Sequence, residues 1–295
     1  MDATVSTIPG EGPVRWVSPA WLADHLDDRL LIIDCQPDVH EYVSGHVPGA
    51  VYLNDHLFRT HLGTLPTSWI DREPAAWLLR QIGLEADVPV VVYTGSPTIT
   101  ACRAHVGDGL EQPMVAYSLL RYGHGDVRIL DGGLDAWRRE GLPVTREYTA
   151  ARASVYGPHV RDALFVDYDE FVELMGRPDT VVLDARPPDK YSGQGPWLKP
   201  GHIPGAVSLP WKALMGAENS RKLRPHGEIR AAAEAAGATP DRTVVCSCGT
   251  GREATNEFLI FRYLLGYPKV RLYEGSFTDW VSRPGNPTVT GPDPR

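Results

Sequence analysis

Runs of apolar residues, each only a few positions long, recur along the chain and alternate with helix-start signals. The runs are Leu31–Ile33, Val90–Val92, Val181–Leu183 and Thr243–Cys246. Continuous apolar runs of this length are typical of strands that are covered on both faces, as in a parallel sheet. A helix-start signal precedes the first run of each half: Ser18-Pro19 before Leu31, and Asp167, with Glu170 three positions later, before Val181. This alternation predicts an α/β fold with a mainly parallel sheet flanked by helices.

The same pattern occurs twice along the chain. Four landmarks return in the same order, separated by 150, 156, 154 and 143 positions: Asp34 and Asp184, His46 and His202, Thr94 and Cys248, Trp137 and Trp280. Both histidines lie in a Gly-His-[Val/Ile]-Pro-Gly-Ala turn. Landmarks that keep their order and spacing indicate one domain duplicated along the chain. We therefore expect two tandem domains, over residues 14–146 and 160–285, each large enough for its own core.

The composition narrows the classes of protein to consider. The chain has 295 residues, of which 42% are hydrophobic, and a formal net charge of −8. The apolar content is too high for a disordered chain, and the apolar runs are too short to cross a bilayer. The acidic balance argues against a general nucleic-acid binder. Four cysteines are too few for a disulfide framework, and no secretory leader pattern opens the chain, so we expect a cytoplasmic monomer.

The two halves differ at the end of the second valine-rich strand. The first half has Thr94 there, whereas the second has Cys248, followed by the loop Gly249-Thr250-Gly251 and an apolar helical stretch. In an open α/β sheet, ligands bind beyond the carboxyl ends of the strands. Loop N–H groups and a helix dipole lower a thiol pKa from about 8.5 to roughly 3.5–7.5. This placement predicts a nucleophilic thiolate at Cys248.

The other cysteines fit a simpler interpretation. Cys35, Cys102 and Cys246 lack a loop of this kind, and a lone cysteine usually packs as a small hydrophobic side chain. Cys246 lies two positions before Cys248, so a strand points both side chains to one face. A resolving disulfide or a Cys-x-Cys metal site is conceivable there, but no clustered histidines accompany the pair. We therefore predict no metal site.

Three motifs together resemble the rhodanese family of sulfurtransferases. They are Gly201–Ala206 after Asp184-Ala-Arg186, the loop Cys248–Glu253, and Tyr273–Trp280. The resemblance is to the two-domain form, the thiosulfate and 3-mercaptopyruvate sulfurtransferases, and covers about Val14 to Arg283. It implies two tandem rhodanese-like domains, of which the second holds the active cysteine and the first is catalytically silent. Thr94 at the position that corresponds to Cys248 agrees with that implication.

The resemblance also implies the chemistry. The Cys248 thiolate would attack the outer sulfur of a small anionic donor, thiosulfate or 3-mercaptopyruvate, and release sulfite or pyruvate. The resulting persulfide would pass its terminal sulfur to cyanide, to a small thiol or to a protein thiol such as that of a thioredoxin-like protein. This is covalent catalysis in two steps, with loop N–H groups stabilising the anion, and it implies no metal or organic cofactor.

The resemblance assigns further residues to substrate binding. Because the donors are anions and the chain is acidic, local cations must attract them. Arg186 matches the substrate-binding arginine of the family's Asp-x-Arg motif. The residues after the cysteine complete the candidate site: Gly249, Thr250, Gly251, Arg252 and Glu253.

The loop Cys-Gly-Thr-Gly-Arg-Glu departs from both types of two-domain sulfurtransferase. Thiosulfate enzymes tend to place an arginine directly after the cysteine, where this chain has Gly249. The mercaptopyruvate type tends to read Cys-Gly-Ser-Gly-Val-Thr, and Thr250 could replace that serine in proton handling. Arg252 and Glu253 match neither pattern, so the sequence leaves the donor open.

Residues of the first half are candidates as well. Asp34 and His46 could face Cys248 across a domain cleft, since the mercaptopyruvate type is thought to use such residues. Their counterparts in the second half fit a structural role, holding the turn by hydrogen bonds. Trp197 fits core packing better than the mouth of the site.

Two rival functions were weighed against the sulfurtransferase. A rhodanese-related cysteine phosphatase needs Cys-x5-Arg, but the sixth residue after Cys248 is Ala254, so the phosphate-clamping arginine is absent. A non-catalytic sulfur-relay or regulatory module, receiving persulfide sulfur from a partner protein, is compatible with the unusual loop. Donor assays that follow sulfite or pyruvate separate the relay from the enzyme.

Overall fold

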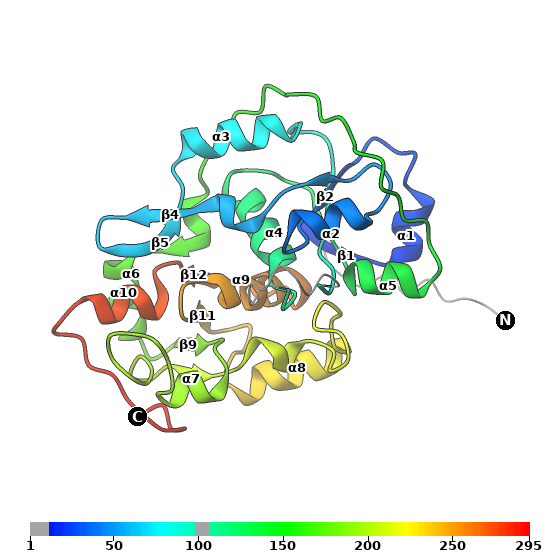
Figure 1. Ribbon diagram of the computed structural model, residues 1–295. Helices are drawn as coiled ribbons and strands as arrows, with labels where there is room; N and C mark the ends of the chain where they lie inside the picture. The colour runs from blue at the N-terminus through cyan, green and yellow to red at the C-terminus, as the bar shows by residue number, and fades with distance from the viewer. Residues whose placement is uncertain (1–11, 98–106) are drawn as a thin grey trace.

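The computed structural model describes residues 12–97 and 107–295, which form two α/β domains around two five-stranded sheets (Figure 1). The first sheet has the order β1-β7-β6-β2-β3, with β1 (Val14–Val17), β2 (Leu31–Asp34), β3 (Val51–Tyr52), β6 (Val90–Tyr93) and β7 (Val127–Leu130). The second has the order β10-β9-β11-β12-β8, with β8 (Phe165–Val166), β9 (Thr180–Asp184), β10 (Val207–Ser208), β11 (Thr243–Ser247) and β12 (Val270–Tyr273).

Both sheets are parallel throughout, and their strand orders coincide. Counted from the first strand of each domain, β1-β7-β6-β2-β3 corresponds to β8-β12-β11-β9-β10. The duplicated α/β domain and its parallel sheet are therefore confirmed. The central strands are covered on both faces as predicted, since β6 is buried at every position and β11 at four of its five.

Helices flank both sheets. The first domain contains α1 (Pro19–Asp24), α2 (Val39–Ser44), α3 (Arg72–Gln81), α4 (Glu111–Arg121) and α5 (Gly133–Arg139). The second contains α6 (Tyr168–Met175), α7 (Pro188–Ser192), α8 (His226–Ala235), α9 (Arg252–Leu259), continued by the π-helical turn η4 (Ile260–Leu264), and α10 (Ser276–Ser282), while η2 (Asp162–Leu164) precedes β8. Ser18 and Asp167 cap α1 and α6, accepting backbone N–H groups at 3.1 and 2.9 Å, so both helix starts are confirmed. The Glu170 carboxylate pairs with Arg271 instead of closing a capping box.

The two domains pack against each other through α4 and α9. Tyr117 on α4 meets Phe258 on α9 edge to face, with ring centroids 5.4 Å apart. Apolar residues of both domains belong to one buried cluster, so the core is continuous across the interface. The loop before α9 consequently lies at the domain boundary.

Each domain also sends an excursion toward the other. In the first domain it consists of the 3-10 turn η1 (Asp55–Phe58) and the antiparallel hairpin β4 (Arg59–Leu62) and β5 (Leu65–Trp69). In the second it consists of η3 (Trp211–Leu214) and a loop closed by a bridge between Met215 and Leu223. Both excursions contribute side chains to the boundary.

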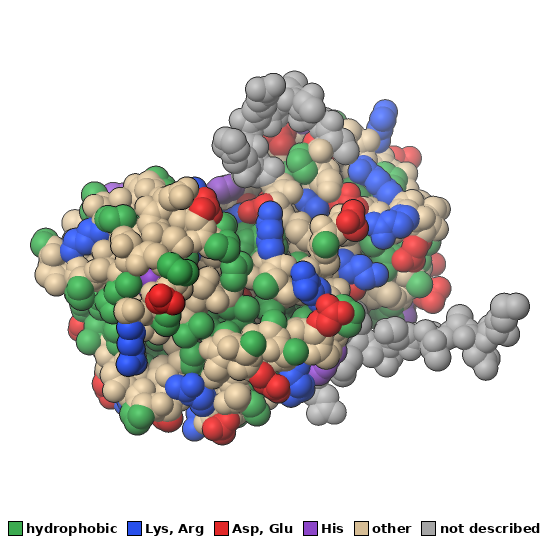
Figure 2. Space-filling model, turned by 90° about the horizontal axis from the view of Figure 1, so that it is seen from below, with side chains coloured by type: hydrophobic (Ala, Val, Ile, Leu, Met, Phe, Trp, Pro, Cys, Tyr) green, Lys and Arg blue, Asp and Glu red, His purple; other side chains and the backbone are tan. Residues whose placement is uncertain are grey.

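The helix lengths and the surface charges bear on two classes of protein that the composition argues against, membrane-spanning proteins and nucleic-acid binders. Within residues 12–97 and 107–295, no helix is long and apolar enough to cross a membrane. On the face shown in Figure 2, basic and acidic side chains are interspersed. That face therefore offers no continuous basic surface of the kind that binds a nucleic-acid backbone.

Candidate active site

Cys248 follows the central strand of the second sheet, at its carboxyl end. The strand β11 ends at Ser247 and α9 begins at Arg252, so a loop of four residues, Cys248 to Gly251, turns the chain between them. Gly251 has a φ of +87°, and a Cβ there would lie 2.7 Å from the carbonyl oxygen of Glu274. Only glycine fits this position. The turn directs the Gly251 N–H to the Cys248 Sγ at 3.1 Å.

The start of α10 holds the same loop through three hydrogen bonds. The Cys248 N–H donates to the Ser276 Oγ at 3.1 Å, while the Cys248 carbonyl accepts from the Phe277 N–H at 3.0 Å. The Gly249 carbonyl accepts from the Thr278 N–H at 3.0 Å. Ser276 has a φ of +50°, the one positive value at a non-glycine residue in the part of the chain described. This strained backbone at a ligand-binding edge fits a site whose geometry is fixed before substrate arrives.

The thiol itself is enclosed. Cys248 has 0% of its surface exposed. Burial raises the pKa of Cys248 well above its usual value, the Glu253 carboxylate raises it further, and the N–H groups of Ala254 and Thr250 lower it. The expectation of a lowered pKa is therefore wrong for this closed state, because desolvation of a thiolate outweighs the amide donors. The Glu253 carboxylate lies close enough to the thiol to favour its protonated form.

Trp197 covers the loop. A Cβ at Gly249 would lie 2.3 Å from Cζ2 of Trp197, so the indole rests directly on that residue. The indole Nε1 donates to the Thr278 Oγ1 at 2.9 Å. Trp197 lies in a segment that is longer in the second domain, where 18 positions separate Asp184 and His202 against 12 between their counterparts. Trp197 is half-buried beside the loop and packs against the apolar cluster around Phe277, which agrees with the expectation of core packing.

Arg186 is fully buried and already paired. Its Nη2 lies 2.6 Å and its Nε 2.9 Å from the Asp184 carboxylate, and Nη2 also donates to the Gly201 carbonyl at 3.0 Å. The guanidinium lies over the rings of Phe277 and Trp197, at 4.2 and 4.8 Å from their centroids. One nitrogen, Nη1, is buried without a hydrogen-bond partner among the described residues. Arg186 therefore lies against Trp197, and its charge is balanced by Asp184.

Arg252 joins the domains. Its guanidinium lies 2.9 Å from Asp108, 3.1 Å from Glu111 and 3.3 Å from Asp55, all of the first domain. Burial lowers the pKa of Arg252, but the three carboxylates outweigh it and raise that pKa. Arg252 is thus committed to an interdomain ion cluster, and the structure does not present it to a ligand at Cys248.

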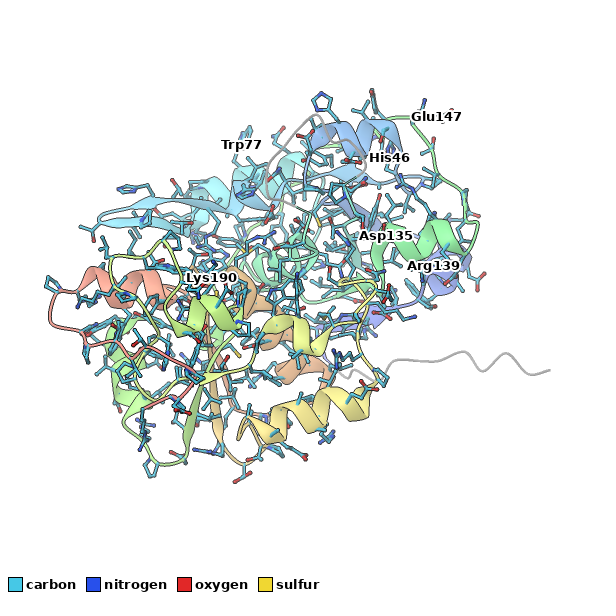
Figure 3. All side chains as sticks on the ribbon, turned by 60° about the horizontal axis from the view of Figure 1, so that its bottom comes forward. His46, Trp77, Asp135, Arg139, Glu147 and Lys190 are labelled. Carbon is cyan, nitrogen blue, oxygen red and sulfur yellow. The ribbon has the colours of Figure 1, made fainter. Side chains whose placement is uncertain are left out.

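Asp34 and His46 are engaged within the first half of the chain. Asp34 is buried, accepts from Tyr93 at 2.6 Å and from the Gln36 side chain at 2.8 Å, and burial raises its pKa to about 6. His46 bonds through Nδ1 to the Tyr42 carbonyl at 2.7 Å and lies beside Glu147 (Figure 3). The structure does not bring these two residues to Cys248, because their described contacts serve the first domain. Their counterparts act alike, since His202 bonds to the Tyr191 carbonyl at 3.0 Å.

The hairpin of the first domain supplies residues that sequence reasoning missed. Arg59 Nη2 donates to the Thr250 carbonyl at 2.5 Å. The Arg59 guanidinium lies 4.1 Å from the Trp69 ring centroid, and that ring also touches Gly251. A single arginine and a tryptophan in a half-exposed hairpin carry no sequence signature of a site in the other domain. Only the packing of the domains brings them to the loop.

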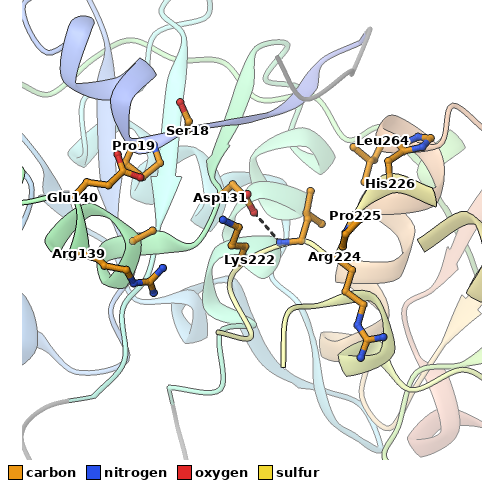
Figure 4. Close-up of a pocket in the computed structure, with 12 residues that line it drawn as sticks. Ser18, Pro19, Asp131, Arg139, Glu140, Lys222, Arg224, Pro225, His226 and Leu264 are labelled. Carbon is orange, nitrogen blue, oxygen red and sulfur yellow. Dashed lines mark hydrogen bonds between the residues drawn. The ribbon is translucent and has the colours of Figure 1, made fainter. Parts of the chain in front are cut away.

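The remaining cysteines and a nearby cavity lie outside this arrangement. Cys35 and Cys246 are buried free thiols, and Cys102 lies outside the described residues. Residues 12–97 and 107–295 contain no group of three or more His, Cys, Asp or Glu side chains able to hold a metal ion. A cavity of about 420 Å³ opens between the domains beside Asp131 and Lys222, but none of its lining residues belongs to the cysteine loop (Figure 4).

Comparison with known proteins agrees with this architecture. The family described as the rhodanese-like domain matches residues 18–140 and 167–283. A Synechococcus elongatus protein provisionally named thiosulfate sulfurtransferase is 37% identical over 98% of this chain and 89% of its own. The sulfur carrier protein TtuD of Thermus thermophilus is 29% identical over 95% of this chain and 98% of its own.

One more relative and one solved structure are similar to this chain. The 3-mercaptopyruvate sulfurtransferase of Escherichia coli K12 is 29% identical over 91% of this chain and 95% of its own. Among solved structures, an anaerobic ergothioneine biosynthesis enzyme from Chlorobium limicola superposes with a TM-score of 0.83. The superposition covers 94% of this chain and 70% of that one, at 21% identity, and shows the shared fold.

Proposed function

Since this chain belongs to the rhodanese family and carries two of its domains, we propose that it is a sulfurtransferase that carries sulfur as a persulfide on Cys248. The observation that supports this most is the position of that thiol. It lies at the carboxyl end of the central strand, between a loop N–H and the first turn of α9. The first domain has Thr94 at the corresponding point, which fits one active site per chain.

The closed site supplies a route for the proton. Glu253 lies in the first turn of α9, and its carboxylate acts on the Cys248 thiol. Proton transfer from Cys248 to Glu253 produces the thiolate when the donor arrives. Glu253 therefore acts as the general base of the first step.

The thiolate then attacks the outer sulfur of the donor. A bond forms between Sγ of Cys248 and that sulfur, and the bond that joins it to the rest of the donor breaks. With thiosulfate the electron pair leaves on sulfite; with 3-mercaptopyruvate it leaves on the enolate of pyruvate, which takes a proton. The new persulfide anion lies near the Gly251, Thr250 and Ala254 N–H groups, which stabilise it without reorganising.

Access of the donor to Cys248, and the choice of donor, depend on the residues around the thiol. Cys248 is fully enclosed, so a donor reaches the sulfur only after part of the surrounding structure moves. Trp197, which rests on the neighbouring Gly249, is the part that we propose to move. Relatives are named for thiosulfate and for 3-mercaptopyruvate, and the loop matches neither pattern fully. Both donors therefore belong in the first assay.

A second candidate function is sulfur relay between proteins. It is favoured by the relative named as a sulfur carrier protein, which aligns along almost the whole chain. In that function Cys248 would receive sulfur from a protein persulfide and pass it on, using the same amides and the same Glu253. The two functions differ in where the sulfur comes from.

Steady-state assays with both donors test the proposal. We expect sulfite release from thiosulfate or pyruvate release from 3-mercaptopyruvate, with cyanide or a small thiol as acceptor. Cys248→Ala should abolish both, whereas Cys246→Ala, a matched buried thiol two positions away, should leave turnover largely intact. Sulfur uptake only from a protein persulfide would favour the relay. Turnover that survives in Cys248→Ala would contradict the proposal.

A further inference from the structure

Three arginines lie against the cysteine loop or begin the helix after it, and they differ in how their charge is balanced. Arg186 is paired with Asp184, and Arg252 is paired with three carboxylates. Arg59 has no carboxylate within ion-pairing distance among the described residues. Its side chain donates to the Thr67 hydroxyl, at 3.0 Å, and to the Thr250 carbonyl. It is therefore the uncompensated cation at the loop.

The acidic side chains near Arg59 are bound to other partners. Glu274 accepts from Arg121 at 2.8 Å and from Tyr117 at 2.7 Å. Asp55 belongs to the cluster around Arg252. Arg59 is half-buried by the hairpin, so its charge is neither fully hydrated nor neutralised. A buried cation without a counter-ion is costly, and a bound anion removes that cost.

The first domain contains an arginine in a similar position whose charge is paired with a carboxylate. Arg221, from the excursion of the second domain, donates to the Gly95 carbonyl at 3.0 Å and to the Ser96 Oγ at 3.1 Å. These residues follow Thr94 as Gly249 and Thr250 follow Cys248. Arg221 therefore clamps the silent loop much as Arg59 clamps the active one. In the first domain, however, Asp135 of α5 lies 3.5 Å from the Arg221 guanidinium.

The active domain lacks that acid. The spacing of 143 positions that relates Trp137 to Trp280 also relates Asp135 to Thr278. Its hydroxyl donates to the Gly249 carbonyl at 2.7 Å. A carboxylate has thus been replaced by a neutral donor only where the neighbouring loop carries the cysteine. The exchange leaves the charge of Arg59, which lies on the cysteine loop at Thr250, without a paired carboxylate.

We infer that Arg59 of the first domain binds the anionic end of the sulfur donor, the sulfonate of thiosulfate or the carboxylate of 3-mercaptopyruvate, beside Cys248. The inference deepens the proposed function and rests on it. Arg59 reaches the cysteine loop itself, because its guanidinium donates to the carbonyl of Thr250, two residues after Cys248. The first domain then contributes a substrate-binding residue, although it has no nucleophile of its own.

Two alkylating reagents of nearly equal size test this without requiring turnover. Iodoacetate is an anion and iodoacetamide is neutral, and both must pass the same cover to reach Cys248. In Arg59→Met, which keeps the length and the contact with Trp69, we expect the iodoacetate rate to fall about 10- to 100-fold relative to the iodoacetamide rate. Arg59→Lys should retain most of the preference for the anion. Arg29→Met, an arginine at an exposed ion pair, is the control and should leave the ratio unchanged.

The same variants are then compared in donor turnover. We expect Arg59→Met to raise the KM for the active donor about 10- to 100-fold, with a smaller effect on kcat. An unchanged ratio of the two alkylation rates in Arg59→Met overturns the inference, as does an equal fall in both rates. If the methionine variant fails to fold, the ratio in Arg59→Lys against the wild type at increasing salt decides, because attraction by a cation weakens with ionic strength. If no donor is turned over, the proposed function fails while the alkylation ratio still reports on Arg59.

Discussion

Removing the Arg252 guanidinium should destabilise the protein strongly, and more so at high pH. Among its three partners, the side chains of Glu111 and Asp55 are only 1% and 4% exposed, whereas that of Asp108 is 32% exposed. In Arg252→Ala two buried carboxylates lose their counter-ion. Glu111 keeps the N–H groups of Gly107 and Gly109, so the loss resembles that of one broken buried pair. We expect a decrease of about 3–5 kcal/mol in the free energy of unfolding at pH 8.

The pH dependence follows from Glu111. Burial raises the pKa of Glu111 and the charge of Arg252 opposes that rise. A carboxyl group whose folded pKa is raised destabilises the fold as pH increases above its unfolded pKa. Without Arg252 the pKa of Glu111 rises further, so more of the destabilisation disappears when the group is protonated. The loss in Arg252→Ala should therefore be smaller at pH 5 than at pH 8.

Urea unfolding followed by tryptophan fluorescence at both pH values measures this effect. The matched control is Arg29→Ala, because Arg29 also contacts two carboxylates, at 2.6 and 2.8 Å, but on the exposed surface. Its loss should be much smaller than that of Arg252→Ala. Equal losses in the two variants, or a greater loss at pH 5 in Arg252→Ala, would refute the assignment of Arg252 to a buried interdomain cluster.

Two further predictions concern the thiol and its cover. Glu253→Gln should slow donor turnover at pH 7 by about 10²–10⁴-fold, with recovery at higher pH. Faster turnover at pH 7 would mean that Glu253 only raises the pKa of the Cys248 thiol. Gly249→Ala places a methyl group 2.3 Å from Trp197, which must shift and lose its bond to Thr278. Alkylation of Cys248 by iodoacetamide should then accelerate. In the control Gly227→Ala the added methyl group meets open space, so the alkylation rate should not change. An unaltered rate in Gly249→Ala would show that Trp197 is no barrier.

The fold could be predicted because its signals are local and occur twice. Continuous apolar runs mark buried parallel strands, and Ser18 and Asp167 form the caps that their positions predicted. The duplication fixed the order of landmarks in both halves, and the two sheets have the same strand order. The place of Cys248 at the end of the central strand followed from the same pattern.

The partners of the charged residues could not be predicted, because they come from the other domain or from distant segments. Arg252 looked available in the loop, but three carboxylates of the first domain hold it. Trp197 rests on the cysteine loop, and its segment was detectable as a change in spacing from 150 to 156 positions. The contrast between Asp135 and Thr278 was also present in the sequence, but it acquires meaning only beside Arg221 and Arg59.

Intact-mass measurement after exposure to the donor tests the central claim most directly. Wild-type protein incubated with thiosulfate or 3-mercaptopyruvate and then desalted should gain ~32 Da, the mass of one sulfur atom held covalently. Cys246→Ala should gain the same mass, and Cys248→Ala should gain none. An added sulfur in Cys248→Ala, or its loss in Cys246→Ala alone, would place the persulfide on another thiol and contradict the account.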